Sequence, residues 1–435
     1  MRFTRLQDWL DWQETLHPKR IDPGLERAGS VARALGLDHC PVPVITVAGT
    51  NGKGSTVAFA EAVLSAAGYR VGVYASPHLL AYNERVRIGG MPVDDAALMR
   101  AFAAIDAARG DISLSYFEFG TLAALWCFQE AGCQVRLLEV GMGGRLDATN
   151  LLDADVAVIV SVALDHCEWL GPDRERIAWE KAGIARAGRP LVFGEPDLPD
   201  SVRRRGRELD APVWLADRDF GASVAQDGSW GYWSASAPAL LAGLPAPALE
   251  GTHQYANAAA ALAALQALGD RLAVSPEAVR RGLAGAALPG RLQRIPGPVE
   301  WVLDVAHNAA ACEALAAALA AWAPSGRTVA LFGLMQRKDL DAVLAPLEKR
   351  VDEWLLVPLP DAEARPGREL AEALAARGGT AEAPASLEAL AAVLQQRLRP
   401  GDRVLAFGSF RVVETVMREI LPAVCPMDTA AAGAE

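Results

Sequence analysis

The chain has 435 residues, of which 51% are hydrophobic and 22% are charged, so it is long enough for two globular domains with large cores. A formal net charge of −11 argues against a general nucleic-acid binder, which would usually be basic. No apolar run is long enough to cross a bilayer, and the N-terminus lacks the pattern of a signal peptide. Since the six cysteines are scattered and form no C-x-x-C pair, we expect a cytoplasmic protein with reduced thiols.

The first half of the chain alternates short apolar runs with helical patterns, after a largely helical start over residues 1–42. The apolar runs have the length and β-branched content of buried strands. This alternation predicts a mainly parallel sheet covered by helices. The predicted strands are 43–48, 71–75, 134–140, 155–161 and 190–194, and the predicted helices between them are 54–67, 94–108, 117–131 and 174–187.

The pattern changes over residues 212–249, where aromatic residues stand among Gly, Ser, Pro and Asp and predict a small β excursion. An alanine-rich helix is predicted over 254–268. Three prolines and two glycines within 289–298 break regular structure and predict a linker. The alternation then restarts, with strands expected at 300–305, 328–333, 353–357 and 402–407.

These boundaries predict an α/β protein with two domains. An N-terminal domain with a mainly parallel sheet spans residues 1–288, and a smaller Rossmann-like α/β domain spans 299–425 after the linker. The last residues, 426–435, are small and polar enough to be disordered.

The most informative segment joins the strand at 43–48 to the helix that follows it. Its glycines let backbone N–H groups curl around an anion, and the helix points its positive end at the same place. Lys53 can reach the outer phosphates of a nucleotide, and Ser55 or Thr56 can reach Mg²⁺ or a phosphate. A strict Walker A pattern would need glycine at Val47 and Ser or Thr at Gly54, but the strand–loop–helix context still predicts a P-loop ATPase domain. The loop comprises Gly49, Thr50, Asn51, Gly52, Lys53, Gly54, Ser55 and Thr56.

Polar residues also follow other predicted strands at their carboxyl ends, where ligands bind in open α/β sheets. One polar residue after a strand is usually a turn or a cap, but six such clusters indicate a site between the two domains. The clusters are Gly49–Thr56, Ser76–His78, Glu139–Asp147, Asp165-His166, Asp304–Asn308 and Gly408–Phe410.

Glu139 and His166 are the candidate metal ligands. Glu139 can be a helix cap or an ion-pair partner, but beside a phosphate loop it fits Mg²⁺, which takes one or two carboxylates plus phosphate oxygens. A lone histidine is more often a core or surface residue than a metal ligand. Because His166 follows Asp165, the sequence is equally compatible with His166 as a ligand of a second metal ion and with a purely structural role. Lys181 lies on a predicted helix, where a lone lysine is usually solvated.

Taken together, these motifs resemble the folylpolyglutamate synthase/dihydrofolate synthase family of the Mur ligase superfamily. Gly54 resembles the folate branch, because cell-wall ligases of the superfamily more often carry Ser or Thr there. Where the family often has Asp-Lys-Asp, this chain has the more cationic Gln336-Arg337-Lys338-Asp339. The matching pieces are Gly49–Ser55, Ser76–Leu79, Phe117–Phe119, Glu139–Asn150, Asp165-His166, Glu180–Ile184, Pro289–Arg291, Asp304–Asn308 and Gly408–Phe410.

The resemblance implies ATP-dependent amide bond formation, in which L-glutamate is added to dihydropteroate and to reduced folates by an enzyme that uses ATP and two Mg²⁺ ions. We expect a monomer that binds no nucleic acid and no membrane. Lys181 matches a lysine that carries a carbamate in the family, and Lys53, Lys181 and His307 are the implied catalytic residues. The implied contacts are Gly49, Thr50, Asn51, Gly52, Lys53, Gly54, Ser55, Asn257, Arg291 and Asp304 with ATP; Ser76, Glu139 and His166 with Mg²⁺; Ile21, Asp22, Pro23, Gly24, Phe117, Glu118, Phe119, Arg145, Leu146 and Asp147 with the pterin; and Asp304, His307 and Ser409 with glutamate.

A carboxylate does not react with an amine at neutral pH, because oxide is its leaving group. The expected route therefore passes through an acyl phosphate made from the acceptor carboxylate and ATP. The alternatives are a monofunctional folylpolyglutamate synthase, another Mur-type ligase, a P-loop switch and a small-molecule kinase. Gly54 and Ile21–Arg27 argue against another Mur-type ligase, and Ile21–Arg27 also favours both folate activities.

Overall fold

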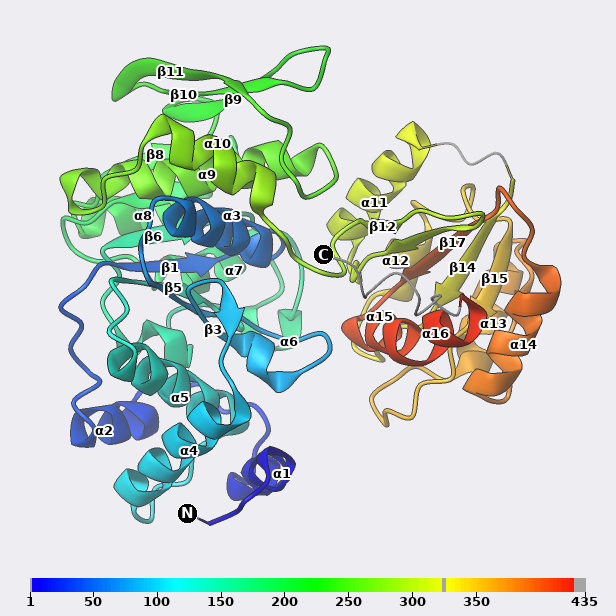
Figure 1. Ribbon diagram of the computed structural model, residues 1–435, viewed down its shortest axis with the longest axis horizontal. Coiled ribbons are helices and arrows are strands. Elements are labelled where there is room, and N and C mark those ends of the chain that lie inside the picture. The colour runs from blue at the N-terminus through cyan, green and yellow to red at the C-terminus, as the bar shows by residue number, and fades with distance from the viewer. Residues whose placement is uncertain (1, 323–325, 426–435) are drawn as a thin grey trace, which may run out of the picture. The chain divides into compact units, whose positions relative to one another are not determined.

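The computed structural model describes residues 2–322 and 326–425, so the tail predicted to be disordered lies outside the described residues. The chain forms two compact units (Figure 1). Unit 1 contains the chain up to Ala248 together with His253–Leu288, and unit 2 contains Leu249–Thr252 and the chain from Pro289 onward. The chain therefore passes from one unit to the other three times. Within 2–322 and 326–425, no helix is both long enough and apolar enough to span a membrane.

Unit 1 is built on an eight-stranded sheet with the strand order β4-β3-β2-β5-β1-β6-β7-β8. The six strands from β2 to β8 in this order are parallel, and β3 and β4 extend the sheet in antiparallel fashion. The central strands are fully buried, because helices cover both faces of the sheet. The strands are β1 (Val44–Ala48), β2 (Val71–Tyr74), β3 (Val86–Ile88), β4 (Met91–Pro92), β5 (Val135–Glu139), β6 (Val156–Ile159), β7 (Leu191–Phe193) and β8 (Val213–Leu215).

Two groups of helices cover the sheet of unit 1 (Figure 1). On one face α3 (Lys53–Ala66), α9 (His253–Ala267) and α10 (Pro276–Gly285) pack together. On the other face α5 (Tyr116–Glu130) lies on the sheet and is covered by α4 (Asp95–Arg109). The remaining elements of the unit are α1 (Leu6–Leu16), α2 (Glu26–Ala34), α6 (Cys167–Leu170), α7 (Arg174–Ala182), α8 (Asp200–Glu208), the short helical turns Tyr82–Arg85, Ala148–Leu151 and Gly269–Arg271, and a three-stranded sheet of β9 (Phe220–Val224), β10 (Trp230–Ser234) and β11 (Ala237–Leu244).

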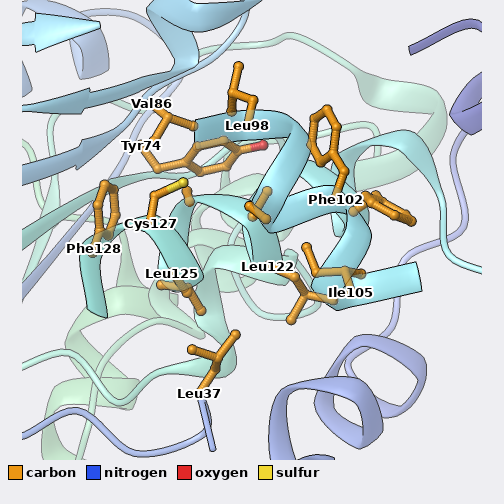
Figure 2. Packing of buried hydrophobic residues seen from close by; sticks show 14 of the residues in the cluster. Leu37, Tyr74, Val86, Leu98, Phe102, Ile105, Leu122, Leu125, Cys127 and Phe128 are labelled. Atoms are coloured by element: carbon orange, nitrogen blue, oxygen red, sulfur yellow. The ribbon is translucent and has the colours of Figure 1, made fainter. Parts of the chain in front are cut away.

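The core on the α5 side of the sheet is rich in aromatic residues (Figure 2). Phe102 from α4 lies at its centre, with ring centroids 5.9 Å from Trp9 and Tyr82 and 5.6 Å from Phe119. All four of these side chains are buried. Since large aromatic side chains bury the most apolar area, this cluster fixes α1, α4 and α5 together beneath the sheet.

The contact between α10 and α3 depends on Gly282, which gives a stability prediction. A Cβ atom at Gly282 would lie 2.4 Å from the Val63 Cα atom, so the two helix backbones can approach only if no side chain intervenes. Gly282→Ala should lower the free energy of unfolding by about 1–3 kcal/mol, measured by urea denaturation. Gly285→Ala in the same helix is the matched control, because nothing lies within 4 Å of its Cβ position, and equal losses in both variants would contradict the prediction.

Unit 2 has a six-stranded sheet with the order β12-β13-β17-β14-β15-β16, in which only β12 is antiparallel to its neighbour. The sheet is flanked by helices that bury a second core. The elements are β12 (Gln293–Ile295), β13 (Glu300–Leu303), α11 (Ala309–Ala321), β14 (Thr328–Phe332), α12 (Leu340–Leu344), β15 (Glu353–Leu356), α13 (Gly367–Ala376), β16 (Ala381–Glu382), α14 (Leu387–Arg397), β17 (Arg403–Phe407), α15 (Phe410–Thr415), a π-helical turn over Val416–Ile420 and α16 (Leu421–Val424).

Two predicted boundaries are wrong. The helix expected over 174–187 ends at Ala182, where the N–H groups of Gly183 and Ile184 bond to carbonyls three residues back and the Glu180 carbonyl also accepts from the Arg145 N–H. The segment 289–298 is not an irregular linker throughout. Its residues Gln293–Ile295 form β12, which pairs with β13 at the edge of the unit 2 sheet.

Candidate active site

The loop between β1 and α3 is held against the segment that follows β6. The Asn51 backbone N–H donates to Ser161 Oγ over 2.9 Å, and that hydroxyl donates back to the Asn51 carbonyl over 2.9 Å. Thr50 Oγ1 bonds both the N–H and the carbonyl of Ala163, at 3.0 and 3.1 Å. Gly52 has a φ of +81°, which favours glycine. The loop is therefore fixed by the fold, as a preformed phosphate cradle must be.

Asn257 of α9 packs directly on this loop. A Cβ atom at Gly52 would lie only 2.5 Å from Asn257 Oδ1, so the absence of a side chain lets the carboxamide approach the loop backbone. Asn257 Nδ2 donates to Gln254 Oε1 over 2.9 Å, and Gln254 Nε2 lies 3.1 Å from His253 Nε2. Gln254 and Asn257 are buried, and the bond between them sets the direction of the Asn257 carboxamide. Gln254, which contacts the predicted site residue Asn257, was not predicted from the sequence, although its spacing of three residues from Asn257 on a helix is a usable signal.

Lys53 lies over its own loop, where its ammonium group donates to the carbonyls of Gly49 at 2.9 Å and Thr50 at 3.2 Å. Ser55 and Thr56 are buried at the start of α3. Within the described residues, the Thr56 hydroxyl is buried without a hydrogen-bond partner. The loop thus gathers one ammonium group and two hydroxyl groups at a helix N-terminus, where an anion is favoured.

The Glu139 carboxylate lies beside the same helix N-terminus. It is 5% exposed, and its Oε2 accepts a hydrogen bond of 3.2 Å from the Ser76 backbone N–H. A Cβ atom at Gly54 would lie 3.7 and 3.8 Å from the two carboxylate oxygens and 3.3 Å from Leu288. A Cβ atom at Gly54 would therefore make ordinary contact with the carboxylate and a tighter contact with Leu288, so the site has little room for a side chain.

The donor groups fit a magnesium ion that also binds phosphate. Glu139 and Ser76 are adjacent and supply the oxygen atoms that Mg²⁺ prefers. His166, the third predicted ligand, is exposed and has the unusual φ of +52° at the start of α6. In the part of the chain that the structure describes, no three His, Cys, Asp or Glu side chains form a metal-binding group. Such a site therefore needs phosphate or water oxygens to complete it.

Lys181 is buried on α7, with 3% of its surface exposed. Burial is the main cause that lowers the pKa of Lys181 to about 7, and the positive charge of Lys53 adds to it against the attraction of Asp165 and Asp147. Lys181 therefore lies within electrostatic range of the phosphate loop. An amine with this pKa is partly neutral at physiological pH, which makes it nucleophilic.

Three of the predicted pterin-binding segments lie together in unit 1. The Gly24 N–H donates to the Leu146 carbonyl over 3.2 Å, and a Cβ atom at Gly141 would lie 2.7 Å from the Phe117 ring and 3.3 Å from Asp147 Oδ2. Burial raises the pKa of Asp147, whose carboxylate accepts from the Met142 N–H at 3.0 Å. The arrangement forms an aromatic and carboxylate surface near Gly141.

Other predicted pterin-binding residues have structural roles. Phe119 is fully buried, with its ring 5.9 Å from that of Trp12. Glu118 forms a capping box with Ser115, since each accepts from the backbone N–H of the other. Arg145 pairs with Glu180 at 3.0 Å and stacks on Trp179, with its guanidinium carbon 4.6 Å from the ring centroid.

In unit 2 the predicted residues gather at the carboxyl ends of the adjacent parallel strands β13 and β17. Asp304 accepts hydrogen bonds from the N–H groups of Leu292 at 2.8 Å and Ala306 at 2.7 Å, while burial raises the pKa of its carboxyl group. Arg291 stacks on Phe410, with its guanidinium carbon 4.9 Å from the ring centroid. Phe410 belongs to the sequence motif Gly408–Phe410, which does not by itself predict this stacking.

His307 and Ser409 complete this cluster. His307 Nδ1 lies 2.7 Å from the Val305 carbonyl, which can only accept, so Nδ1 carries the proton and Nε2 is the basic nitrogen of the neutral ring. The ring centroid of His307 is 6.4 Å from that of Phe410. Ser409 Oγ accepts from the Val412 N–H at 3.2 Å and caps α15.

Gln336 and Arg337 lie in one loop of unit 2 and bond to a second loop of the same unit. Gln336 Nε2 donates to the carbonyls of Ala362 at 3.3 Å and Ala364 at 3.2 Å, and Arg337 lies 3.4 Å from Glu363. The departure from the family pattern therefore has a structural explanation.

Both units match known proteins, and the matches show the family to which the chain belongs. The family model for the "Mur ligase, glutamate ligase domain" matches residues 290–410, which lie in unit 2. A dihydrofolate synthase/folylpolyglutamate synthase of Escherichia coli is 45% identical over 416 residues, covering 95% of each chain. The chain therefore belongs to the dihydrofolate synthase/folylpolyglutamate synthase family.

Solved structures agree with this assignment. The structure of E. coli FolC in complex with DHPP and ADP is 44% identical, with a TM-score of 0.89, over 95% of this chain and 97% of that chain. A bifunctional folylpolyglutamate synthase/dihydrofolate synthase with Mn, AMPPNP and L-glutamate bound is 45% identical, with a TM-score of 0.86, over 95% and 97% of the two chains. The prediction of a two-domain α/β fold with a P-loop ATPase domain and a smaller Rossmann-like domain is confirmed.

Proposed function

We propose that the protein is an ATP-dependent carbon–nitrogen ligase that adds L-glutamate to dihydropteroate, forming dihydrofolate, and to reduced folates, forming polyglutamates. The observation that carries this proposal is the buried Glu139 carboxylate beside the phosphate loop at the start of α3. A carboxylate would repel the phosphates of a nucleotide unless a divalent cation lay between them, so this arrangement calls for ATP with Mg²⁺. The names of the relatives support the two acceptors.

The nucleotide would be held by the loop Gly49–Ser55, with Lys53 on its outer phosphates, and by Asn257, Arg291 and Asp304. Ser76, Glu139 and His166 would hold the two Mg²⁺ ions. When bound, these ions would neutralise charge on the phosphates and act as Lewis acids. Asn257 is supported by its contact with Gly52 and by the bond to the buried Gln254 that orients its carboxamide.

The reaction would proceed in two steps, phosphoryl transfer and then amide formation. First, an oxygen of the acceptor carboxylate forms a bond to the γ-phosphorus of ATP while the bond from that phosphorus to the ADP oxygen breaks. The phosphoryl charge is stabilised by Lys53 and the N-terminus of α3. Second, the neutral amine of glutamate attacks the acyl carbon, phosphate leaves, and the amine proton passes to a base. His307 Nε2 is the proposed base or orienting group, which its tautomer supports.

Lys181 would carry a carbamate. Carbon dioxide reacts with a neutral amine, and a pKa of about 7 makes that form available near neutral pH. The product is an anionic oxygen ligand that suits a second Mg²⁺. The attraction of Asp165 for the Lys181 cation would be lost in this form, so carbamylation also depends on the local balance of charges.

The proposed contacts with the acceptor lie in unit 1, and those with glutamate lie in unit 2. The acceptor would bind to unit 1 at Ile21–Gly24, Phe117–Phe119 and Arg145–Asp147, which lie together there. Glutamate would bind to unit 2 at Asp304, His307 and Ser409. We propose a cytoplasmic monomer that binds neither nucleic acid nor membrane, and the presence of six cysteines without a disulfide supports a reducing compartment.

The test is ADP release with dihydropteroate or tetrahydrofolate as acceptor, each with and without L-glutamate. We expect release with both acceptors to depend on glutamate, and each product to be an amide one glutamate longer by mass spectrometry. Release with tetrahydrofolate alone would indicate a monofunctional folylpolyglutamate synthase. Release that ignores glutamate would indicate a P-loop switch, and a stable phosphorylated acceptor would indicate a kinase.

A further inference from the structure

A group of charged side chains centred on Asp22 holds the segment before α2. Arg27 Nη1 lies 2.7 Å from Asp22 Oδ2, and Arg27 Nη2 donates to the Asp22 carbonyl over 2.7 Å. His17 Nε2 lies 3.2 Å from the same Oδ2, and Lys19 Nζ donates to Oδ1 over 3.2 Å. We call His17, Lys19, Asp22 and Arg27 the Asp22 cluster. Hydrogen bonding from Lys19, followed by His17, lowers the pKa of Asp22, which keeps its carboxylate ionised.

The Asp22 cluster is tied to the start of α5. Arg27 Nη2 lies 3.2 Å from Glu118 Oε1, and Glu118 is 3% exposed and fixed by its bond from the Ser115 N–H. His17 Nδ1 lies 2.9 Å from Ser113 Oγ, which precedes the same helix. The charges therefore connect the segment around Asp22 to the α5 side of the acceptor surface. A second connection is the bond from the Gly24 N–H to the Leu146 carbonyl.

We propose that Asp22 is a positioning residue that holds Ile21–Gly24 in place for the acceptor and does not itself bind the pterin. This inference rests on the proposed function. Both carboxylate oxygens of Asp22 are already used by side chains of its own cluster. Oδ2 already accepts from both His17 and Arg27, so a pterin N–H that bound there would displace one of them. Displacing Arg27 would cost its guanidinium one of its two carboxylate partners, the other being the buried Glu118.

The members of the Asp22 cluster differ in importance. The Lys19 side chain is 69% exposed, so water screens its charge and the pair contributes little. The Arg27 side chain is 27% exposed and touches Asp22 as well as Glu118. The connection therefore depends mainly on Asp22 and Arg27, which act as one unit.

The test compares steady-state kinetics of ADP release in single and double variants. Asp22→Ala and Arg27→Met should each raise KM for dihydropteroate by about tenfold, with kcat and KM for ATP nearly unchanged, because the binding segment becomes less ordered. The double variant should be no worse than either single variant, since both break the same contact. Asp22→Asn should fall between Asp22→Ala and the wild type, because its amide oxygen can still accept from Arg27.

Asp106→Ala is the matched control. Asp106 also pairs with two arginines, Arg2 at 2.9 Å and Arg109 at 3.0 Å, but it lies on α4 and takes no part in the Asp22 cluster. Its KM for dihydropteroate should not change. An unchanged KM in folded Asp22→Ala, or additive losses in the double variant, would overturn the inference. If Asp22→Ala does not fold, Asp22→Asn and Arg27→Met carry the same test, and wild-type activity with dihydropteroate checks the proposed function separately.

Discussion

Replacing Lys53 with alanine is expected to lower glutamate-dependent ADP release by about a thousandfold or more, while the protein stays folded. The Lys53 ammonium group donates to two carbonyls of its own loop, Gly49 and Thr50, and both carbonyls belong to the loop rather than to the hydrophobic core. The ammonium group would leave these carbonyls for the phosphates of the nucleotide, where it stabilises the charge that moves during phosphoryl transfer. The variant Lys53→Ala should therefore have a much lower kcat than the wild type.

The measurement is a coupled assay of ADP with thermal unfolding as a check on the fold. Lys349→Ala is the control, because Lys349 is an exposed lysine in unit 2 and is outside every proposed contact. It should retain the wild-type rate. Full turnover by Lys53→Ala would rule out the assignment of this loop as the phosphate cradle.

Replacing Lys181 with alanine should also abolish most activity, and added short-chain carboxylates should restore part of it. A small carboxylate can occupy the space of the missing side chain and supply the oxygen atoms that the carbamate would have supplied. A carbamate would also appear as a ¹³C signal in enzyme equilibrated with labelled bicarbonate, and Lys181→Ala should lack that signal. An unaffected rate would remove the carbamate proposal.

The buried amine also has a consequence for stability in buffer without carbon dioxide. The pKa of Lys181 is about 7 in the folded chain and 10.5 in an exposed lysine, so between these values the unfolded chain binds more protons. The free energy of unfolding should therefore rise with pH from about 7 to 10.5. Urea denaturation across this range should show a smaller rise for Lys181→Ala.

The sheet of each unit could be predicted from the sequence because its strands are short apolar runs that are buried on both faces. Predicted 43–48 and 328–333 correspond to β1 (Val44–Ala48) and β14 (Thr328–Phe332). The end of α7 could not be predicted this way. The last turn of α7 contacts Arg145, whose N–H donates to the Glu180 carbonyl, and these residues are far apart in sequence.

The candidate site, too, could be predicted from the sequence only in part. Strand order places the ends of β1 and β5 side by side, so Glu139 could be expected near the phosphate loop from topology alone. Gln254 was missed because a polar side chain inside a predicted helix is usually solvated, although its spacing of three residues from Asn257 places both on one helix face. The role of Glu118 was accessible, since Ser115 and Glu118 have the spacing of a capping box, but the resemblance assigned it to the pterin.

The three crossings of the chain between the units matter for anyone who divides the protein. A C-terminal fragment that begins at Pro289 would lack Leu249–Thr252, although this short segment belongs to unit 2. The fragment would lose Glu250, whose Oε1 lies 3.9 Å from Arg294 Nη1. Unit 2 is thus discontinuous in sequence, and a clean excision would require joining two separate stretches of chain. A protease that cleaves only near residue 289 would leave Leu249–Thr252 joined to unit 1 at both ends, with no peptide bond to the rest of unit 2.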